Sequence, residues 1–205
     1  MSSKEKITVW LDNDGVIKDD VEAAFAKKGF GPMDAQQVVA KRFVYNAFKE
    51  MLFVSLHLRM SSSAKSLSWD ALPPREGVVK KAQKWVEEGA LHGKEVSIGI
   101  ITSNPDVSFE KLKGLFNAAG IKPDAVRVSG NMKKGAYLNS LPGENVLVDD
   151  NYFSFLRLDT RKNKGIALKT DYTNIMRKYI TKLKGVYGAD NIEEVDEKIL
   201  GMIRK

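Results

Sequence analysis

Five short apolar runs, separated by longer polar or amphipathic stretches, constrain the fold of this 205-residue chain more than any other feature. Strands that are buried in a parallel sheet are short and apolar on both faces, so each run is predicted to be such a strand. Strands that alternate with helices predict a doubly wound, Rossmann-like α/β fold, with about five parallel strands and helices on both faces of the sheet. The five runs cover residues 7–11, 96–101, 125–128, 145–148 and 165–168.

Helical patterns lie between and after these runs. Apolar residues repeat at helical spacing over 78–86 and again over 112–119, where Gly120 is placed to end the second helix. Two more helices are predicted around 172–184 and 190–204. With 43% apolar residues the chain can bury a core, yet no apolar run approaches the roughly 20 residues that cross a bilayer. We therefore expect no association with a membrane.

One segment interrupts the alternation of strands and helices. Residues 19–72 contain no clear strand, and their apolar spacing predicts helices over 19–28 and 34–60. We predict that 19–72 form a small helical cap, inserted after the first strand of a core domain made of 1–18 and 73–205.

Two carboxylates stand where the first predicted strand ends. Side chains alternate between the faces of a strand, so Asp12 and Asp14 are expected on the same side. Gly15 then lets the chain turn without a clash at Cβ. One carboxylate in such a pair can attack a substrate while its neighbour moves a proton.

Other polar groups follow later strands. A strand, a turn and a helix place hydroxyl, amide and backbone N–H groups where they can bind a phosphate; the side chains concerned are Thr102, Ser103 and Asn104. A lysine pair, Lys133 and Lys134, stands at the start of another predicted helix. Finally, Asp149 and Asp150 follow the fourth apolar strand, where paired acids are costly unless a cation accompanies them.

Taken in order, these motifs resemble those of the haloacid dehalogenase (HAD) superfamily of phosphohydrolases. The resemblance runs from about residue 7 to 151. It implies that Asp12 is a nucleophile that forms an aspartyl-phosphate, and that Asp14 is the acid and base for the leaving oxygen and for water. It also implies a Mg²⁺ ion bound by these two residues and the later acidic pair, Asp149 and Asp150, with Asp150 as the direct ligand. The substrate phosphate would be bound by Thr102, Ser103, Asn104 and one of the two lysines, with Lys134 the better match and Lys133 the alternative.

Within the superfamily the sequence looks most similar to the 5′(3′)-deoxyribonucleotidase-like group. The similarity lies in the Asp-x-Asp-Gly-Val motif, the short predicted cap, the re-entry at 72–77, the Ile-Thr-Ser sequence and the Asp-Asp pair. It implies a small phosphorylated substrate such as a (deoxy)nucleoside monophosphate, because a cap closes over small substrates and excludes water.

Charge leaves two other functions open. The net charge is +7, and residues 157–184 contain nine Lys or Arg against two Asp. Such a field attracts phosphates and nucleic acid. The alternatives are therefore a phosphatase that acts on nucleic-acid ends, and a non-catalytic protein that binds phosphate or nucleic acid on the same fold.

Two scarce residue types limit the remaining chemistry. The chain has no cysteine and only two histidines, so a bound metal is expected to have oxygen ligands, which favours Mg²⁺. The absence of cysteine also fits a reducing compartment. The first residues lack the apolar region of a secretory signal. Together these features predict a cytoplasmic protein.

Overall fold

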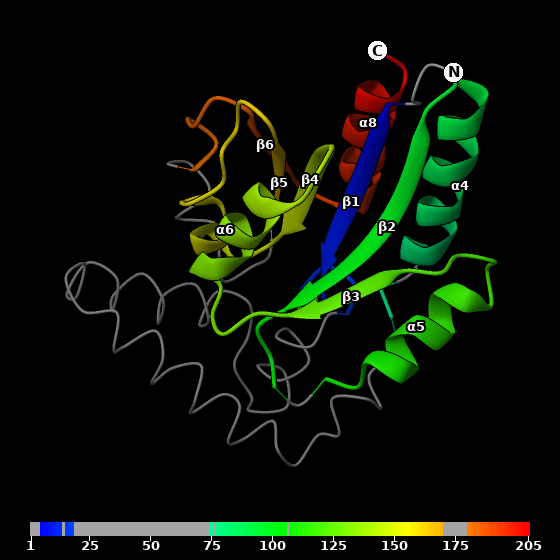
Figure 1. The fold of residues 1–205 in the computed structure, drawn as a ribbon, viewed down its shortest axis with the longest axis horizontal. Coiled ribbons are helices and arrows are strands. Elements are labelled where there is room, and N and C mark those ends of the chain that lie inside the picture. Colours follow the sequence, from blue (N-terminus) through cyan, green and yellow to red (C-terminus); the bar gives the residue numbers. More distant parts are fainter. Residues whose placement is uncertain (1–4, 14, 19–73, 76, 106, 170–179) are drawn as a thin grey trace.

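A six-stranded, all-parallel sheet forms the centre of the protein (Figure 1). The structure is a computed structural model, and it describes residues 5–13, 15–18, 74–75, 77–105, 107–169 and 180–205. The strands are β1 (Lys6–Asp12), β2 (Glu95–Thr102), β3 (Asp124–Arg127), β4 (Glu144–Asp149), β5 (Lys164–Leu168) and β6 (Val186–Ala189). Their order in the sheet is β3-β2-β1-β4-β5-β6, which confirms the predicted doubly wound α/β fold.

Helices cover both faces of this sheet (Figure 1). The helical elements are α4 (Val78–Leu91), α5 (Phe109–Asn117), α6 (Met132–Ser140), the short 3₁₀ helix η2 (Tyr152–Phe155) and α8 (Ile192–Ile203). Buried residues of α4, α5 and α8 share one apolar cluster with one face of the sheet, while those of α6 and η2 pack in a second cluster against the other face. The molecule therefore has three layers in the part that the structure describes.

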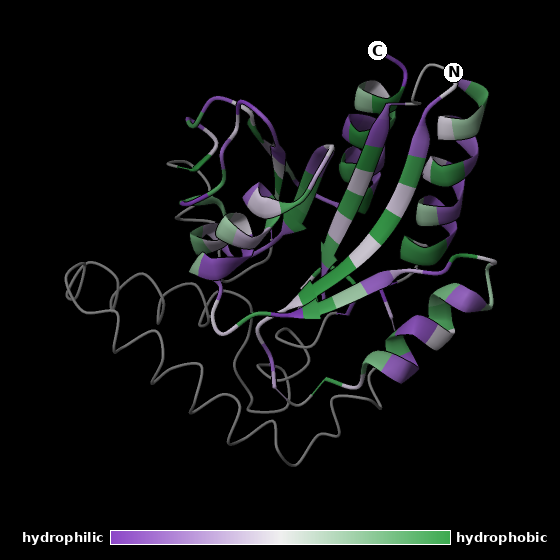
Figure 2. Ribbon diagram, in the orientation of Figure 1, coloured by the Kyte–Doolittle hydropathy of each residue, from purple (hydrophilic) through white to green (hydrophobic). Residues whose placement is uncertain are grey.

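The alternation of side chains along β1 assigns residues to these two layers. Ile7, Val9 and Leu11 belong to the cluster under α4 and α8, whereas Trp10 belongs to the cluster under α6. Figure 2 shows the result as apolar colour along the central strands and mixed colour on the helices that cover them. By the same alternation Asp12 faces the α6 side of the sheet, which decides where its partners come from.

All five predicted strands are present, and a sixth is added at the edge. β6 was not predicted, because its sequence Val-Tyr-Gly-Ala is short and half-exposed. The predicted helix over 172–184 is wrong at its end: Ile180 is helical, but 181–185 form turns that let the chain run back beside β5. Gly185 makes this turn at a φ of 85°.

Some of the predicted helices lie in the part that the structure describes, and others do not. Helices α4, α5 and α8 lie where the helical spacing placed them. The prediction that Gly120 ends the second helix is wrong: α5 ends at Asn117 with Ala118 as its C-cap, and Gly120 lies in the turn that follows, with a φ of 76°. The predicted helices at 19–28 and 34–60, and the cap that they would form, lie outside the described residues. Within the described part, no helix combines the length and the apolar character needed to traverse a lipid bilayer.

Candidate active site

The carboxyl ends of β1 and β4 lie side by side at the centre of the sheet. To one side of this pair the sheet continues with β2 and β3, and to the other with β5 and β6. Such a reversal of strand order leaves a crevice beyond the strand ends, where ligands bind in open α/β sheets. Asp12 is the last residue of β1, Asp149 is the last residue of β4, and Asp150 follows it. The predicted acidic residues of the two strands therefore meet at the expected edge.

A lysine from α6 joins the two strands. The Lys134 ammonium lies 2.8 Å from Asp12 Oδ1 and 2.8 Å from Asp149 Oδ2. Helix α6 packs on the face of the sheet to which the side chains of Asp12 and Asp149 point, so its first turn can reach both carboxylates. Three positions that are far apart in the sequence thus form one buried ionic cluster.

Backbone amides fix the orientation of both carboxylates. The Asn13 N–H donates to Asp12 Oδ1 over 2.8 Å, and the Asn151 N–H donates to Asp149 Oδ1 over 2.7 Å. Hydrogen bonds from a backbone N–H to a carboxylate are short and strong. The two acids are therefore held in place by the chain that immediately follows each strand.

Lys134 is buried completely, and its charge is retained there. Burial by itself lowers the pKa of a lysine, but the carboxylates of Asp12 and Asp149 outweigh that effect and raise the pKa of Lys134 above its usual value. The side chain is accordingly a fixed cation that offsets two of the acids.

The two predicted lysines lie in different surroundings. Lys134 is in the ionic cluster, whereas the Lys133 ammonium donates to the hydroxyl of Ser129 on the exposed side of α6. Gly135 explains how deeply Lys134 sits: a Cβ at this position would lie 2.7 Å from the Ser154 carbonyl oxygen, so only glycine lets α6 approach η2 so closely.

Asp150 packs against the turn that follows β1. Gly15 has a φ of 83°, and a Cβ there would lie 2.3 Å from Asp150 Oδ2 and 2.4 Å from its Cγ. Glycine is therefore required at this position both for the turn and for the close approach of the Asp150 carboxylate. The glycine of the predicted Asp-x-Asp-Gly motif thus leaves space for the carboxylate of Asp150, which follows the neighbouring strand β4.

The predicted phosphate-binding side chains lie at the end of β2, the other neighbour of β1. Thr102 is fully buried, and its hydroxyl accepts a hydrogen bond of 3.0 Å from the Asn104 N–H. The Ser103 hydroxyl donates to the side-chain oxygen of Asn131, which precedes α6. The end of β2 is thereby linked to the helix that carries Lys134.

Three carboxylates could bind a metal ion. Asp12, Asp149 and Asp150 are buried, and each can offer one oxygen such that the three oxygens lie within 4.8 Å of one another. Carboxylate oxygens are the donors that Mg²⁺ prefers. The three negative charges exceed the single charge of Lys134, and a divalent cation would balance the remainder. The donor set therefore fits the predicted ion in charge and in chemistry.

Two predictions are not tested by this geometry. Asp14, the expected acid and base, lies outside the described residues. The basic stretch at 157–184 is described only in part: Arg161 pairs with Asp159, and the Lys162 ammonium donates to backbone carbonyls of Asn139 and Leu141.

Two contacts of the site were missed by the sequence reasoning. The amide of Asn13 is a backbone donor, which residue type cannot reveal. Arg75 donates from Nη2 to the Gly15 carbonyl oxygen over 3.1 Å, from a position 60 residues away in the sequence. The only signal for Arg75 was its place in the re-entry segment at 72–77.

Comparisons with known proteins add evidence about the fold. No protein-family model matches the sequence, and no curated protein matches it. A solved structure from Bacteroides vulgatus, assigned as a beta-phosphoglucomutase, aligns at 12% identity over 99% of this chain and 92% of that chain, with a TM-score of 0.58. The structure of Protein Tyrosine Kinase A from Mycobacterium tuberculosis aligns at 13% identity over 97% and 99%, with a TM-score of 0.50. A HAD-superfamily hydrolase of subfamily IA from Geobacter sulfurreducens PCA aligns at 16% identity over 97% and 100%, with a TM-score of 0.47. At these identities the first two likenesses show that the fold is shared.

Proposed function

We propose that this protein is a HAD-type, Mg²⁺-dependent phosphomonoester hydrolase. The observation that carries the proposal is the buried cluster in which Lys134 lies 2.8 Å from both Asp12 and Asp149, beside Asp150, at the switch point of the sheet. A buried lysine between buried acids is expensive to build for stability alone, because the desolvation cost of buried charges can exceed the energy of their attraction. Perturbed, buried charges in such a crevice are typical of a functional site.

The residues divide the proposed reaction between them. A carboxylate oxygen of Asp12 attacks phosphorus, the bond from phosphorus to the leaving oxygen breaks, and Asp14 gives that oxygen its proton. Asp14 then takes a proton from water, the water oxygen attacks phosphorus, and the bond to Asp12 breaks to release inorganic phosphate. Lys134 stabilises the charge on the transferred phosphoryl group, where phosphoryl-transfer enzymes gain most of their acceleration.

The acidic pair takes two different parts in this proposal. One carboxylate oxygen of Asp149 pairs with Lys134, and the other accepts a hydrogen bond from the Asn151 N–H. Asp149 therefore serves mainly to orient the lysine. Asp150 is the proposed direct ligand, together with Asp12, and Gly15 gives it room. A bound Mg²⁺ would neutralise charge on the phosphoryl oxygens.

Phosphate binding is assigned to the end of β2. The buried Thr102 hydroxyl already accepts the Asn104 amide, so its own hydrogen can be donated to a phosphate oxygen. Ser103 and Asn104 stand beside it in the same turn. Alignment of the phosphate over Asp12 is the contribution expected of these groups.

A small phosphorylated metabolite is the proposed substrate, and deoxynucleoside monophosphates are the first to try. Support comes from the sequence similarity to the deoxyribonucleotidase-like group and from the basic net charge. We propose an assay of phosphate release with Mg²⁺ from p-nitrophenyl phosphate, deoxynucleoside monophosphates, sugar phosphates and oligonucleotides with a terminal phosphate. Preference for the oligonucleotides would favour the alternative of a phosphatase for nucleic-acid ends.

The assay also separates an enzyme from a binding protein. Asp12→Asn should lose nearly all activity, since removal of a nucleophile leaves only positioning effects. EDTA should abolish the wild-type rate, and added Mg²⁺ should restore it. Wild-type protein that is folded, binds Mg²⁺ and hydrolyses none of these esters would contradict the proposed function.

A further inference from the structure

Arg75 connects the segment that leads into α4 with the loop that follows β1. Its Nη2 donates to the Gly15 carbonyl oxygen over 3.1 Å, and its backbone N–H donates to the Ile17 carbonyl oxygen over 2.6 Å. Next to these contacts, Lys18 and Pro74 form an antiparallel bridge. The side chain and the backbone of Arg75 thus contact two residues of the 15–18 loop.

Gly15 is also the point where this loop meets the proposed metal site. The place that a Cβ of Gly15 would take is 2.3–2.9 Å from three atoms of the Asp150 carboxyl group. A small displacement of Gly15 toward β4 would therefore push on Asp150, and a displacement away would open space beside its carboxylate. The hydrogen bond from Arg75 acts on the peptide group of this same residue.

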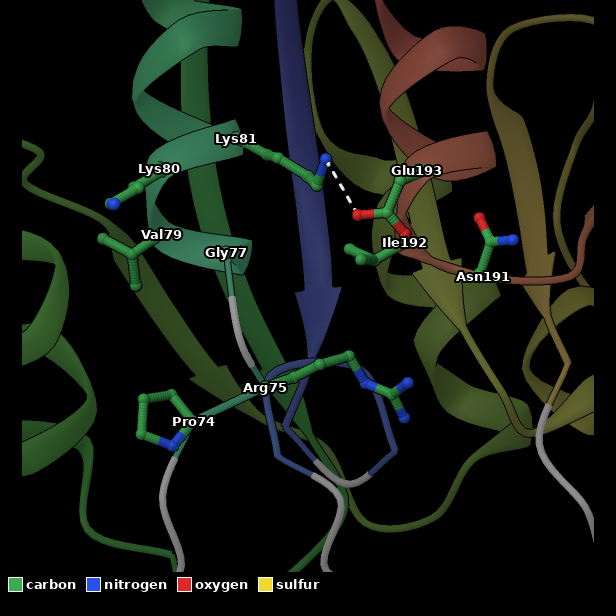
Figure 3. Close-up of a pocket in the computed structure, with 9 residues that line it drawn as sticks. All are labelled: Pro74, Arg75, Gly77, Val79, Lys80, Lys81, Asn191, Ile192 and Glu193. Atoms are coloured by element: carbon green, nitrogen blue, oxygen red, sulfur yellow. Dashed lines mark ion pairs between the residues drawn. The ribbon is translucent and has the colours of Figure 1, made fainter.

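Arg75 also lines a pocket of about 810 Å³. It is bounded by the starts of α4 and α8, and above Arg75 the Lys81 ammonium pairs with Glu193 over 3.3 Å (Figure 3). Figure 3 shows the Arg75 side chain extending from the re-entry segment across the loop that follows β1. Removal of the Arg75 side chain would therefore extend this pocket toward Gly15.

We propose that Arg75 is a positioning residue for the metal site: it fixes Gly15 against the Asp150 carboxylate and so sets the geometry in which Asp150 binds Mg²⁺. The role of Arg75 toward Mg²⁺ rests on the proposed function, whereas the hydrogen bond from Arg75 to Gly15 is independent of it. Groups that orient metal ligands typically change metal affinity or activity by about 10- to 100-fold when they are removed.

Two variants with unbranched side chains separate the hydrogen bond from the packing of the side chain. Arg75→Met keeps an apolar stem without a donor, whereas Arg75→Lys keeps a stem, a charge and a donor. Mg²⁺ affinity, measured by calorimetry on the full chain, should fall by about 10- to 100-fold in Arg75→Met and by only a few-fold in Arg75→Lys. Arg204→Ala removes an arginine whose guanidinium pairs with Glu88, and this control should bind Mg²⁺ as the wild type does.

Chemical rescue provides a readout that a structural role alone would not move. Arg75→Ala opens the cavity toward Gly15, and guanidinium ion at millimolar, non-denaturing concentration should restore much of the Mg²⁺ affinity. The same ion should have no such effect on wild type or on Arg204→Ala. Amide hydrogen exchange of residues 15–18, measured without metal, should be faster in Arg75→Met than in Arg75→Lys.

The outcomes distinguish this inference from the proposed function. If wild type binds Mg²⁺ and Arg75→Met binds it equally well, the positioning role is refuted while the phosphatase proposal stands. If wild type binds no Mg²⁺, the proposed function fails and the role toward the metal fails with it. If Arg75→Met is unfolded, Arg75→Lys and Arg75→Ala still decide the question. The proposal is overturned if both variants lose Mg²⁺ affinity to the same extent and guanidinium ion restores none of the affinity of Arg75→Ala.

Discussion

At the scale of residues, one lysine does most to hold the proposed site together. Lys134 is the partner of both Asp12 and Asp149, and all three are buried. The sequence predicted all three, but it left Lys133 and Lys134 as alternatives, since neighbours on a helix differ only in the direction they face. That direction depends on how α6 packs, which requires the structure.

Removal of this lysine should destabilise the protein strongly. Lys134→Met leaves two buried carboxylates without their shared cation, and breaking a buried pair in this way costs about 3–5 kcal/mol in the free energy of unfolding. The measurement is urea denaturation in the presence of EDTA. Lys133→Met is the matched control, and as an exposed substitution it should change stability by no more than about 0.5 kcal/mol. Equal effects of the two substitutions would contradict the assignment.

The charge of Lys134 also predicts how stability depends on pH. Burial acts to lower the pKa of Lys134, but Asp12 and Asp149 raise it overall. A group with a raised pKa in the folded state gives its full stabilisation below the unfolded value, about 10.4 for lysine, and loses it only as the pH passes the higher folded value. The difference in unfolding free energy between wild type and Lys134→Met should therefore not decline between about pH 6 and 9. A decline across that interval would show that Lys134 loses its proton there.

At the scale of elements, the sequence predicted strands β1 to β5, including β3 at one edge of the sheet, but it did not predict β6 at the other edge. Strands β1, β2, β4 and β5 are buried and read as continuous apolar runs, so their positions follow from composition alone. β6 is an edge strand with a glycine and an exposed Tyr187, and it lacks that signal. The contact of Arg75 with Gly15 was also beyond reach, because it joins segments separated by 60 residues.

The packing of α6 on η2 gives a prediction for this scale. In Gly135→Ala the new methyl group meets backbone atoms of Ser154 and Leu158, which cannot move away as a flexible side chain would. We expect a loss of about 1–3 kcal/mol, the usual cost of overpacking, together with reduced phosphatase activity as Lys134 is displaced. Thermal unfolding and the phosphate-release assay measure the two effects.

A second helical glycine supplies the control for this experiment. Gly114 lies in α5, and among the described residues no atom beyond its chain neighbours and the backbone of its own helix lies within 4 Å of the place that its Cβ would take. Gly114→Ala should stabilise the protein by about 0.4–1 kcal/mol, because it lowers the entropy of the unfolded chain. If Gly135→Ala were stabilising to the same extent, α6 would not pack as described.

At the scale of the whole molecule, the fold brings together groups from β1, β4 and α6. The sequence predicted this assembly because the carboxyl ends of parallel strands meet at one edge, and the observed strand order places β1 and β4 at the switch point. The predicted cap over 19–72 stays a prediction, as does the role of Asp14. Specificity for a substrate depends on groups outside the cluster, which is why the motifs indicate a reaction more clearly than a substrate.

Binding of Mg²⁺ should stabilise the folded molecule as a whole. A ligand that binds only the native state adds about 2.7 kcal/mol at a concentration 100 times its dissociation constant. Wild type should therefore unfold at higher temperature with Mg²⁺, whereas Asp150→Asn should show little change. Asp124→Asn, at an exposed position at the start of β3, should respond as wild type does. Equal shifts in all three proteins would place the ion elsewhere.

Asp12 should become phosphorylated during turnover, and trapping with borohydride would reveal this intermediate. Borohydride reduces an aspartyl-phosphate to homoserine, which peptide mass spectrometry can locate. Wild-type protein treated during hydrolysis of a phosphate ester with Mg²⁺ should carry homoserine at position 12, and protein without substrate should not. If active enzyme keeps only aspartate at position 12 while a known aspartyl-phosphate is reduced in a parallel control, Asp12 is not the nucleophile.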